Sequence, residues 1–368
     1  MAKGMNLKSV KSENRSMILY MLNTYGSLSR KEIAGKLSLT PAAVTKICNE
    51  LIDEGFIKES GFIDANGKSG RREVLLSLCL EDKLVLGVNA EKNGITYSLA
   101  NLKGKAIYLK KSPLYTDIDA ALKELLSFVA ENEIDLKRVL AAGVCIIGST
   151  EQNDFGVWKN CDIKEKFQTA LGIPVVVENN VKAFAQGELI YGRASRSNSV
   201  LFFKWGAGIG SSIASGGKVQ SGNDNGIAEI GHYIVNTGGK KCRCGRYGCL
   251  ETEVSSQAII SEAGGKMTLE EIVNSNDKDI IYMLDHKIDL VALALVNTAT
   301  ILNADSIVLF GLLFENERII KKLVKQCVRY NRNFNDNIIK ISSLNQKREY
   351  IGCIAMCAKE YFFEIGFN

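Results

Sequence analysis

Proline, histidine and long apolar runs are scarce in this sequence. Only 3 of the 368 residues are proline, which excludes a Pro-rich linker or stalk. Only 2 residues are histidine. The longest apolar run near the N-terminus, Met17–Leu22, is too short for a secretory signal or a bilayer span. No later run is long enough either. We therefore expect a soluble, cytoplasmic protein that does not insert into membranes.

The composition is that of a globular protein of two or three domains. Apolar residues make up 46% and charged residues 24% of the chain, and a domain usually takes roughly 100–200 residues. The net charge of +5 is unevenly placed, because residues 1–80 carry 12 Lys and Arg against 8 Asp and Glu. This excess points to nucleic acid as a partner of the N-terminal part.

The first eighty residues have the pattern of three helices followed by two strands. Arg15–Tyr25 carries a broad apolar stripe, and Ser29 with Glu32 forms a capping-box pattern that opens a short second helix. Thr40-Pro41 is a typical start for a third helix. Phe56–Ser60 and residues 73–78 read as strands on either side of a basic, glycine-bearing loop. We therefore predict a winged helix-turn-helix over residues 1–80.

In such a domain the third helix enters the major groove of DNA and the loop between the strands acts as a wing. The alternative is a helical protein–protein module with a solvated basic loop. On the first interpretation, the expected DNA contacts are Arg30, Ala42, Ala43, Thr45, Lys46, Asn49, Arg71 and Arg72.

Strands and helices alternate after residue 84, which predicts two α/β lobes with ligand chemistry in the cleft between them. Among the expected helices is one over residues 290–303. The expected strands are residues 84–88, 96–102, 106–109, 139–147, 175–177, 200–204, 209–214 and 306–310.

Three of the ten cysteines lie within eight residues, close to one of the two histidines. His232, Cys242, Cys244 and Cys249 make a complete tetrahedral zinc set, and glycines inside the run allow tight turns. The alternatives are four unrelated residues or a redox pair. A closed set leaves no open position for water, so we predict a structural zinc loop near residues 232–249 that braces the neighbouring Glu229 and Glu251.

The run Gly226-Ile-Ala-Glu-Ile-Gly-His232, followed by Cys-x-Cys-Gly-x-x-Gly-Cys-Leu-Glu at residues 242–251, strongly resembles the ROK family of bacterial sugar-responsive repressors and sugar kinases. The segments around Glu178-Asn179-Asn180 and the glycine loop of Gly206, Gly208 and Gly210 agree with it in order. So does the basic segment of residues 69–72, which matches the repressor branch.

The resemblance implies an actin/hexokinase-like (ribonuclease-H-like) pair of lobes over residues 81–368, with a sugar in the interlobe cleft and a structural zinc beside it. By the family motif, the sugar contacts fall on Asn179, Asn180, Glu229, His232 and Glu251. Carboxylates, amides and imidazole supply the donors and acceptors that sugar hydroxyls need.

The departures from the kinase pattern argue against phosphoryl transfer. The position of the kinase general base is Asn180, and an amide cannot take a proton at neutral pH. The first phosphate loop reads Asn89-Ala-Glu-Lys-Asn-Gly94, which places Glu91 where phosphate would lie, and the late glycine pair reads Phe310-Gly311. Only the glycine loop at 206–210 survives, and a lone glycine loop is weak evidence for nucleotide. We therefore expect no catalytic residues.

The sequence thus predicts a repressor that binds operator DNA and releases it when a monosaccharide or sugar phosphate binds between the lobes. Two heads would match a two-fold operator in a homodimer, with a tetramer also open. Two alternatives remain, a ROK sugar kinase with a DNA-binding head and a repressor controlled by a protein partner.

Overall fold

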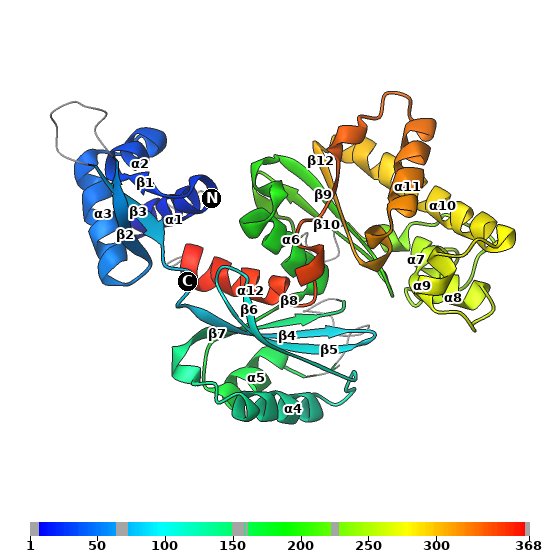
Figure 1. The fold of residues 1–368 in the computed structure, drawn as a ribbon, viewed down its shortest axis with the longest axis horizontal. Coiled ribbons are helices and arrows are strands. Elements are labelled where there is room, and N and C mark those ends of the chain that lie inside the picture. Colours follow the sequence, from blue (N-terminus) through cyan, green and yellow to red (C-terminus); the bar gives the residue numbers. More distant parts are fainter. Residues whose placement is uncertain (1–6, 64–72, 149–157, 159–160, 222–227, 365–368) are drawn as a thin grey trace.

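The chain folds into a small N-terminal head and two α/β lobes (Figure 1). The computed structural model describes residues 7–63, 73–148, 158, 161–221 and 228–364. Within those ranges, none of the helices combines the length and apolarity that a bilayer span requires. The architecture confirms the predicted fold class.

The head, residues 7–78, places three helices on a three-stranded sheet of order β1-β3-β2. Ser29 caps α2 through the predicted capping box with Glu32, and Thr40 caps α3 with Pro41 at its first position. The elements are α1 (Leu7–Tyr25), β1 (Leu28–Ser29), α2 (Arg30–Leu37), α3 (Pro41–Asp53), β2 (Ile57–Ile63) and β3 (Glu73–Leu78).

The first lobe is a mixed five-stranded sheet of order β6-β5-β4-β7-β8, in which β4, β7 and β8 are parallel. Helices α4 and α5 pack on one face and α12 on the other. The elements are β4 (Leu84–Glu91), β5 (Gly94–Asn101), β6 (Ala106–Ser112), α4 (Ile118–Glu131), β7 (Val139–Ile146), α5 (Ile163–Leu171), β8 (Val175–Asn179) and α12 (Ile351–Ala358).

The second lobe has a five-stranded sheet of order β11-β10-β9-β12-β13, covered on one face by α7, α10 and α11. The elements are β9 (Ser199–Trp205), β10 (Ile209–Ser215), β11 (Lys218–Val219), α7 (Leu250–Val254), α8 (Ser256–Glu262), α9 (Leu269–Val273), α10 (Lys278–Leu302), β12 (Ser306–Phe310), α11 (Glu317–Tyr330) and β13 (Ile339–Ile341).

Helix α6 (Asn180–Tyr191) lies between the lobes, against α12 on one side and the second sheet on the other. The ring of Phe184 in α6 stacks on Phe310 of β12, with centroids 3.9 Å apart. The helix is buried almost along its whole length. It is therefore the element that both lobes share.

The head is packed onto the first lobe through a continuous hydrophobic core. The π-helical turn Lys359–Phe363, which follows α12, brings Phe363 against Tyr20 of α1, with stacked rings 4.8 Å apart. Phe362 meets Phe56 at 5.1 Å. One buried cluster contains residues of α1, α3, α6 and α12. The head is therefore packed directly against the first lobe.

Several expected element bounds are wrong. Helix α1, expected over Arg15–Tyr25, begins at Leu7. Strand β4 runs on to Glu91, because only a two-residue turn joins it to β5 and Glu91 pairs with Gly94 across the hairpin. Helix α10 begins at Lys278 and not at residue 290. Charged side chains interrupt its apolar pattern. The buried Lys287 lies 2.6 Å from Glu262, and Asp285 lies 2.7 Å from Lys322.

Candidate functional sites

A cavity between the lobes gathers most of the sugar contacts expected from the sequence. Asn179 and Asn180 reach it from the end of β8 and the start of α6, while Glu229 and Glu251 reach it from the second lobe. Gly208 and Gly210 also line it, whereas Gly206 lines a neighbouring interlobe cavity. His232 is not among the residues that line either cavity. It lies in the metal cluster described below.

The side chain of Asn179 holds the start of α6 in place. Its Oδ1 accepts the backbone N–H groups of Val181 and Lys182 at 2.9 and 3.2 Å, and its Nδ2 donates to the carbonyl oxygen of Gly148 at 3.0 Å. Asn179 is thus the N-cap of the helix as well as a lining residue. Asn180 is the first residue of that helix.

Glu251 is the most enclosed carboxylate of the cavity, with 9% of its side chain exposed. Its Oε2 accepts the backbone N–H of Ile209 at 3.0 Å. A Cβ atom at Gly208 would lie 2.8 Å from the same oxygen, so this part of the glycine loop admits only glycine without a shift. Its Oε1 faces Lys92 Nζ at 3.5 Å and Arg243 Nε at 3.4 Å.

Residues Asn89–Gly94, which replace the first phosphate loop of the kinases in the sequence comparison above, form the turn of a β-hairpin. Its charged side chains reach the other lobe. Glu91 pairs with Lys204 of β9 at 2.7 Å. Burial alone would raise the pKa of Glu91, but the Lys204 ammonium lowers it, and the pKa falls below its ordinary value. Lys92 donates to the carbonyl oxygen of Ala207 at 3.3 Å. Both lysines belong to the cavity wall, and the sequence analysis did not single them out.

The second interlobe cavity, of about 380 Å³, brings together the remnants of the kinase phosphate segments. Residues Asn89 and Gly94 of the hairpin, Gly206 of the glycine loop and Gly311 after β12 all line it. The Glu91–Lys204 pair belongs to its wall as well. A close ion pair of this chain thus lines the same cavity as the glycines of these segments.

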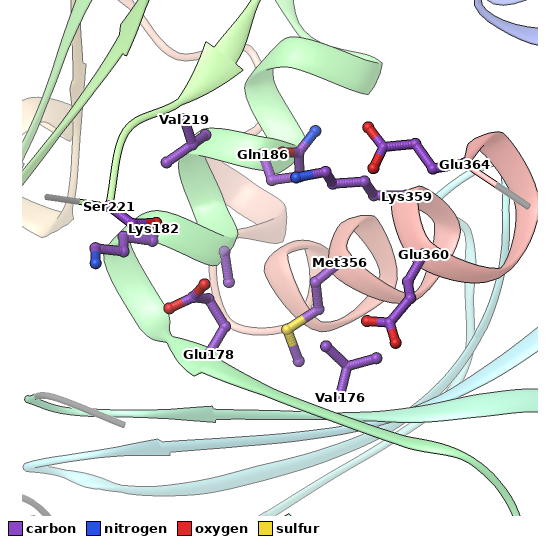
Figure 2. Close-up of a pocket in the computed structure, with 11 residues that line it drawn as sticks. Val176, Glu178, Lys182, Gln186, Val219, Ser221, Met356, Lys359, Glu360 and Glu364 are labelled. Atoms are coloured by element: carbon purple, nitrogen blue, oxygen red, sulfur yellow. The ribbon is translucent and has the colours of Figure 1, made fainter. Parts of the chain in front are cut away.

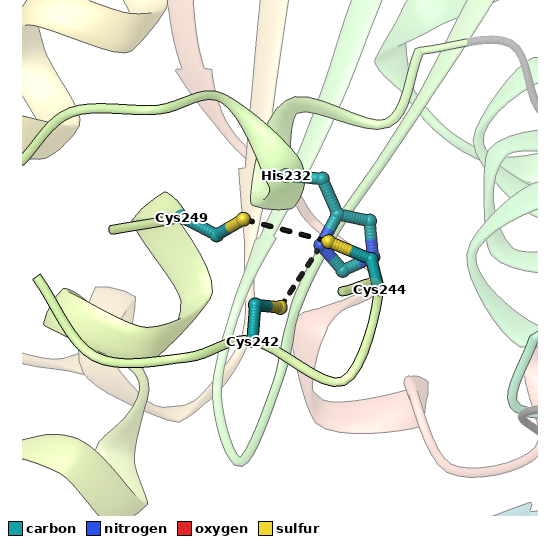
Figure 3. A group of neighbouring side chains, drawn as sticks. All are labelled: His232, Cys242, Cys244 and Cys249. Atoms are coloured by element: carbon teal, nitrogen blue, oxygen red, sulfur yellow. Dashed lines mark hydrogen bonds between the residues drawn. The ribbon is translucent and has the colours of Figure 1, made fainter. Parts of the chain in front are cut away.

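His232, Cys242, Cys244 and Cys249 form a cluster that could hold a metal ion (Figure 3). Their ligand atoms all lie within 4.8 Å of one another. The Sγ atoms of Cys244 and Cys249 are 3.6 Å apart, and Cys242 Sγ is 3.5 Å from Nδ1 of His232. A tetrahedral ion with bonds of about 2.0–2.3 Å places its ligand atoms roughly 3.5–3.8 Å apart. These two separations therefore match those around such an ion.

The imidazole of His232 is shared between the cluster and the cavity side. Its Nδ1 faces the thiols, and its Nε2 lies 3.9 Å from Glu229 Oε2. Burial raises the pKa of Glu229 above its ordinary value.

The turn of the metal loop requires a glycine at position 248. Gly248 has φ +68°, and a Cβ atom there would lie 1.5 Å from the carbonyl oxygen of Asn236. The metal loop thus belongs to the same continuous segment, residues 229–251, that carries Glu229 and Glu251 of the cavity wall.

The far end of α6 touches the head. The side-chain amide of Asn23 in α1 donates to the carbonyl oxygen of Ile190 at 2.7 Å. A cavity of about 310 Å³ flanks α6 between β8 and the C-terminal segment (Figure 2). Lys182 and Gln186 line it from α6, opposite Met356 and Lys359. The helix therefore has one end in the interlobe cavity, the other on the head, and a second cavity at its side.

The expected DNA-contacting residues of α3 lie on the solvent side of the helix. Ala42, Thr45, Lys46 and Asn49 are exposed and Ala43 is half-buried. Arg30 donates to Oδ1 of Asn49 at 3.1 Å, which joins the start of α2 to the same face. The expected wing contacts Arg71 and Arg72 lie outside the described residues.

Comparisons with known proteins agree with this two-part organisation. The model of the ROK family matches residues 85–360, and the model of the MarR family matches residues 11–60. A putative xylose repressor of Caldicellulosiruptor sp. (strain Rt8B.4) is 26% identical, over 94% of this chain and 96% of its own length. The N-acetylglucosamine repressor of Shigella flexneri is 24% identical, over 95% and 93%.

Solved structures show the same fold. A ROK family transcriptional regulator, a homologue of the E. coli MLC protein, superimposes with a TM-score of 0.80 at 23% identity, over 97% of this chain and 98% of its own. The ROK hexokinase of Thermus thermophilus gives 0.62 at 21% identity, over 98% of its own chain but 75% of this one. The match to the regulator extends over more of this chain than the match to the kinase.

Proposed function

The chain belongs to the ROK family, and on that premise we propose that it is a sugar-responsive DNA-binding transcriptional repressor. Residues 1–80 would bind operator DNA and residues 81–368 would sense the sugar. The family matches to residues 11–60 and 85–360 lie on either side of this boundary. The similarity to a putative xylose repressor and to an N-acetylglucosamine repressor supports the same function.

The position of α6 is the observation that carries the proposal. It begins at Asn180 in the interlobe cavity. Near its other end, the carbonyl oxygen of Ile190 accepts a hydrogen bond from Asn23 of the head. A 12-residue helix spans about 18 Å as a rigid unit. A ligand that reorients the lobes therefore moves the head, and DNA affinity falls by the coupling free energy, typically about 1–3 kcal/mol.

For the sugar we propose Asn180, Glu229 and Glu251 as direct contacts, with Asn179 and His232 beside them. Carboxylates accept from hydroxyls and the amide of Asn180 can both donate and accept. The Oδ1 of Asn179 already accepts hydrogen bonds from the first backbone N–H groups of α6. His232 offers only Nε2 once Nδ1 faces the thiols.

We propose that the protein does not phosphorylate its sugar. Asn180 cannot act as a general base at neutral pH. In addition, Glu91 and Lys204 neutralise each other where a phosphate would need cations, and Lys92 is directed to Glu251 and Ala207. Phosphoryl transfer depends on charge placed against the phosphate oxygens, and these pairs remove it.

For the cysteine cluster we propose a structural zinc ion. Three thiolates and one imidazole are the donors that Zn²⁺ prefers, and all four positions are filled by protein. When bound, the ion supplies a covalent brace to the loop. The residues themselves keep Glu229 and Glu251 facing the same cavity, because the segment from residue 229 to 251 closes on itself through Cys249 and Ile234.

On DNA we propose that Ala42, Ala43, Thr45, Lys46 and Asn49 of α3 face the major groove, with Arg30, Arg71 and Arg72 beside them. Small residues at the start of a recognition helix permit a close approach to the bases, and the polar ones can contact base edges or phosphates. Two heads in a homodimer would match a two-fold operator.

The test has two measurements on the full-length, zinc-loaded protein. Thermal unfolding against a panel of monosaccharides and sugar phosphates, with and without ATP, finds the effector, since a ligand at 100 times its Kd adds about 2.7 kcal/mol. Fluorescence anisotropy on DNA selected from a random-sequence library then measures operator binding with and without that effector. We expect stabilisation by a sugar but not by ATP, and release of DNA by that sugar. Stabilisation by ATP, or a stabilising sugar that leaves DNA binding unchanged, would overturn the proposal.

A further inference from the structure

Glu229 is the central residue of a three-residue turn whose two ends are bonded to one serine. The backbone N–H of Ile230 donates to the carbonyl oxygen of Ala228 at 2.8 Å, which closes the turn. Glu229 has φ −75° and ψ 57°, close to the values of an inverse γ-turn. The hydroxyl of Ser211 in β10 donates to the same carbonyl oxygen and accepts the N–H of Ile230 at 3.2 Å. A single side chain therefore bonds both backbone groups that close the turn.

The backbone immediately before Glu229 is strained. Ala228 has φ +66°, in the left-handed region where the Cβ atom of any residue except glycine is crowded by the backbone. Asn and Asp can offset this cost because their side chains hydrogen-bond to the nearby backbone, and the methyl group of alanine cannot. The conformation of Ala228 therefore depends on its surroundings. The hydrogen bond that Ser211 donates to its carbonyl oxygen is one contact that holds it.

The start of β10 holds both carboxylates that the second lobe contributes to the interlobe cavity. The backbone N–H of Ile209 binds Glu251 Oε2 directly, and Ser211, two residues later, binds the turn that carries Glu229. A Cβ atom at Gly231 would lie 2.6 Å from the carbonyl oxygen of Ile209. The turn thus lies directly on this strand and takes its position from it.

We infer that Ser211 is a positioning residue of the proposed sugar site. Its hydroxyl fixes the strained turn, and so directs the Glu229 carboxylate to the cavity before a sugar binds. The inference rests on the proposed sugar-sensing function and adds to it a residue that acts through Glu229. A carboxylate that is ordered when the chain folds binds more tightly than one that must be ordered during binding.

The first experiment compares Ser211→Thr, which keeps the hydroxyl, with Ser211→Val, which has nearly the same shape without it. Binding of xylose, glucose, N-acetylglucosamine and the phosphate ester of each is measured by isothermal titration calorimetry on the zinc-loaded, full-length proteins. For the sugar that the wild type binds most tightly, we expect Ser211→Val to weaken binding about tenfold and Ser211→Thr to stay within about threefold. Ser211→Ala repeats the test without added bulk and should match Ser211→Val.

Ser212→Ala is the matched control for these variants. Ser212 is the next residue of β10, so its side chain points to the opposite face of the sheet. Its hydroxyl is buried, and no hydrogen-bond partner for it lies among the described residues. We expect this change to leave sugar affinity within about twofold of the wild type. Zinc content and the unfolding midpoint show whether each variant keeps its fold.

The second experiment tests whether Ser211 acts through Glu229. Glu229→Ala removes the carboxylate, so no group is left for the turn to direct to the cavity. We expect Ser211→Val to weaken sugar binding by less than about twofold in the Glu229→Ala background, against about tenfold in the wild type. A serine that only stabilises the fold, or that contacts the sugar itself, would give the same loss in both backgrounds.

The outcomes separate this inference from the function on which it rests. If Ser211→Val binds sugar as Ser212→Ala does, if Ser211→Thr loses as much affinity as Ser211→Val, or if the loss is the same with and without the Glu229 side chain, the positioning role is wrong and sugar sensing stands. If the wild type binds none of these sugars or phosphate esters, sugar sensing itself fails and the positioning role falls with it.

Discussion

The side-chain amide of Asn23 in α1 donates a hydrogen bond of 2.7 Å to the backbone oxygen of Ile190, close to the last residue of α6. Oxygens at a helix C-terminus lack partners within the helix, so a side chain from another unit that satisfies one of them ties the two together. The bond links the DNA-binding head to the helix that starts at the interlobe cavity.

Replacing Asn23 with alanine should weaken the response of DNA binding to sugar. The change removes one hydrogen bond, typically worth about 1 kcal/mol, at the contact between α6 and the head. We expect sugar affinity to stay within about twofold and the sugar-induced loss of DNA affinity to shrink severalfold, both measured by titration. Asn14→Ala, on the same helix, is the control. An unaltered sugar response in Asn23→Ala would show that the signal takes another route.

The aromatic contact between head and first lobe should be a large contributor to stability. Phe363 is fully buried and stacks on Tyr20, and truncating a buried phenylalanine to alanine usually costs about 3–5 kcal/mol. We expect Phe363→Ala to lower the denaturation midpoint and to expose the head to protease. Phe62→Ala, at an exposed position of β2, should change stability by less than about 0.5 kcal/mol. Equal midpoints for the two variants would mean that the head is not docked as described.

The helices of the head could be predicted because each carries its own local signal. The capping box at Ser29 and the Thr40-Pro41 start set two helix boundaries without help from the rest of the fold. Helix α12 has no such signal, because all of its residues are buried and no apolar face stands out. Periodicity detects a helix only when one side meets water.

The same distinction applies to the candidate sites. The four residues of the His/Cys cluster share a short segment and a distinctive chemistry, so the sequence predicted that they lie together, and the structure brings them together. Lys92, Lys204 and Arg243 become neighbours only when two lobes close on each other. The place of Arg243 between Cys242 and Cys244 suits a residue that offsets thiolate charge, and in the structure its Nε also faces Glu251 Oε1 at 3.4 Å. Nothing in the local sequence predicts this second contact.

Restoring an acid at the kinase base position should not restore kinase activity. Asn180→Asp supplies a carboxylate at the start of α6, but the Glu91–Lys204 pair remains and leaves no cation free there for a phosphate. We expect no ATP turnover above the wild-type level with any sugar of the panel, measured by a coupled assay. Sugar-dependent turnover in the variant would show that Asn180 alone separates this chain from a kinase.

The cysteine cluster should contain one metal ion per chain whose removal destabilises the protein. We expect about one zinc per chain by elemental analysis of protein purified without added metal. A strong chelator, or Cys249→Ser at a fully buried ligand, should lower the unfolding midpoint by several degrees, because metal binding contributes directly to folding free energy. Cys79→Ser, outside the cluster, is the control. A zinc-free protein with an unchanged midpoint would contradict the structural role.

Glu188 should make stability depend on pH with the opposite sign from a salt-bridged carboxylate. It is 1% exposed within α6, where the hydroxyl of Ser342 and the backbone N–H of Arg193 donate to its oxygens. Burial raises its pKa above the ordinary value of 4.5. The unfolded chain therefore releases this proton at lower pH than the folded one, and stability is lost as the pH rises from 4.5 towards the raised pKa.

A side chain that cannot ionise at this position avoids that loss. We expect Glu188→Gln to unfold at a higher temperature than the wild type at pH 7.5, and the difference to narrow as the pH falls towards 4.5. The Ser342 hydroxyl can rotate to accept from the new amide, so the hydrogen bonds are kept. Glu317 is exposed, and its hydrogen bond with Lys321 lowers the pKa of its carboxyl group. The control Glu317→Gln should therefore change the unfolding temperature little at either pH. A difference between Glu188→Gln and wild type that grows as the pH falls would mean that this carboxylate is stabilised in its charged form.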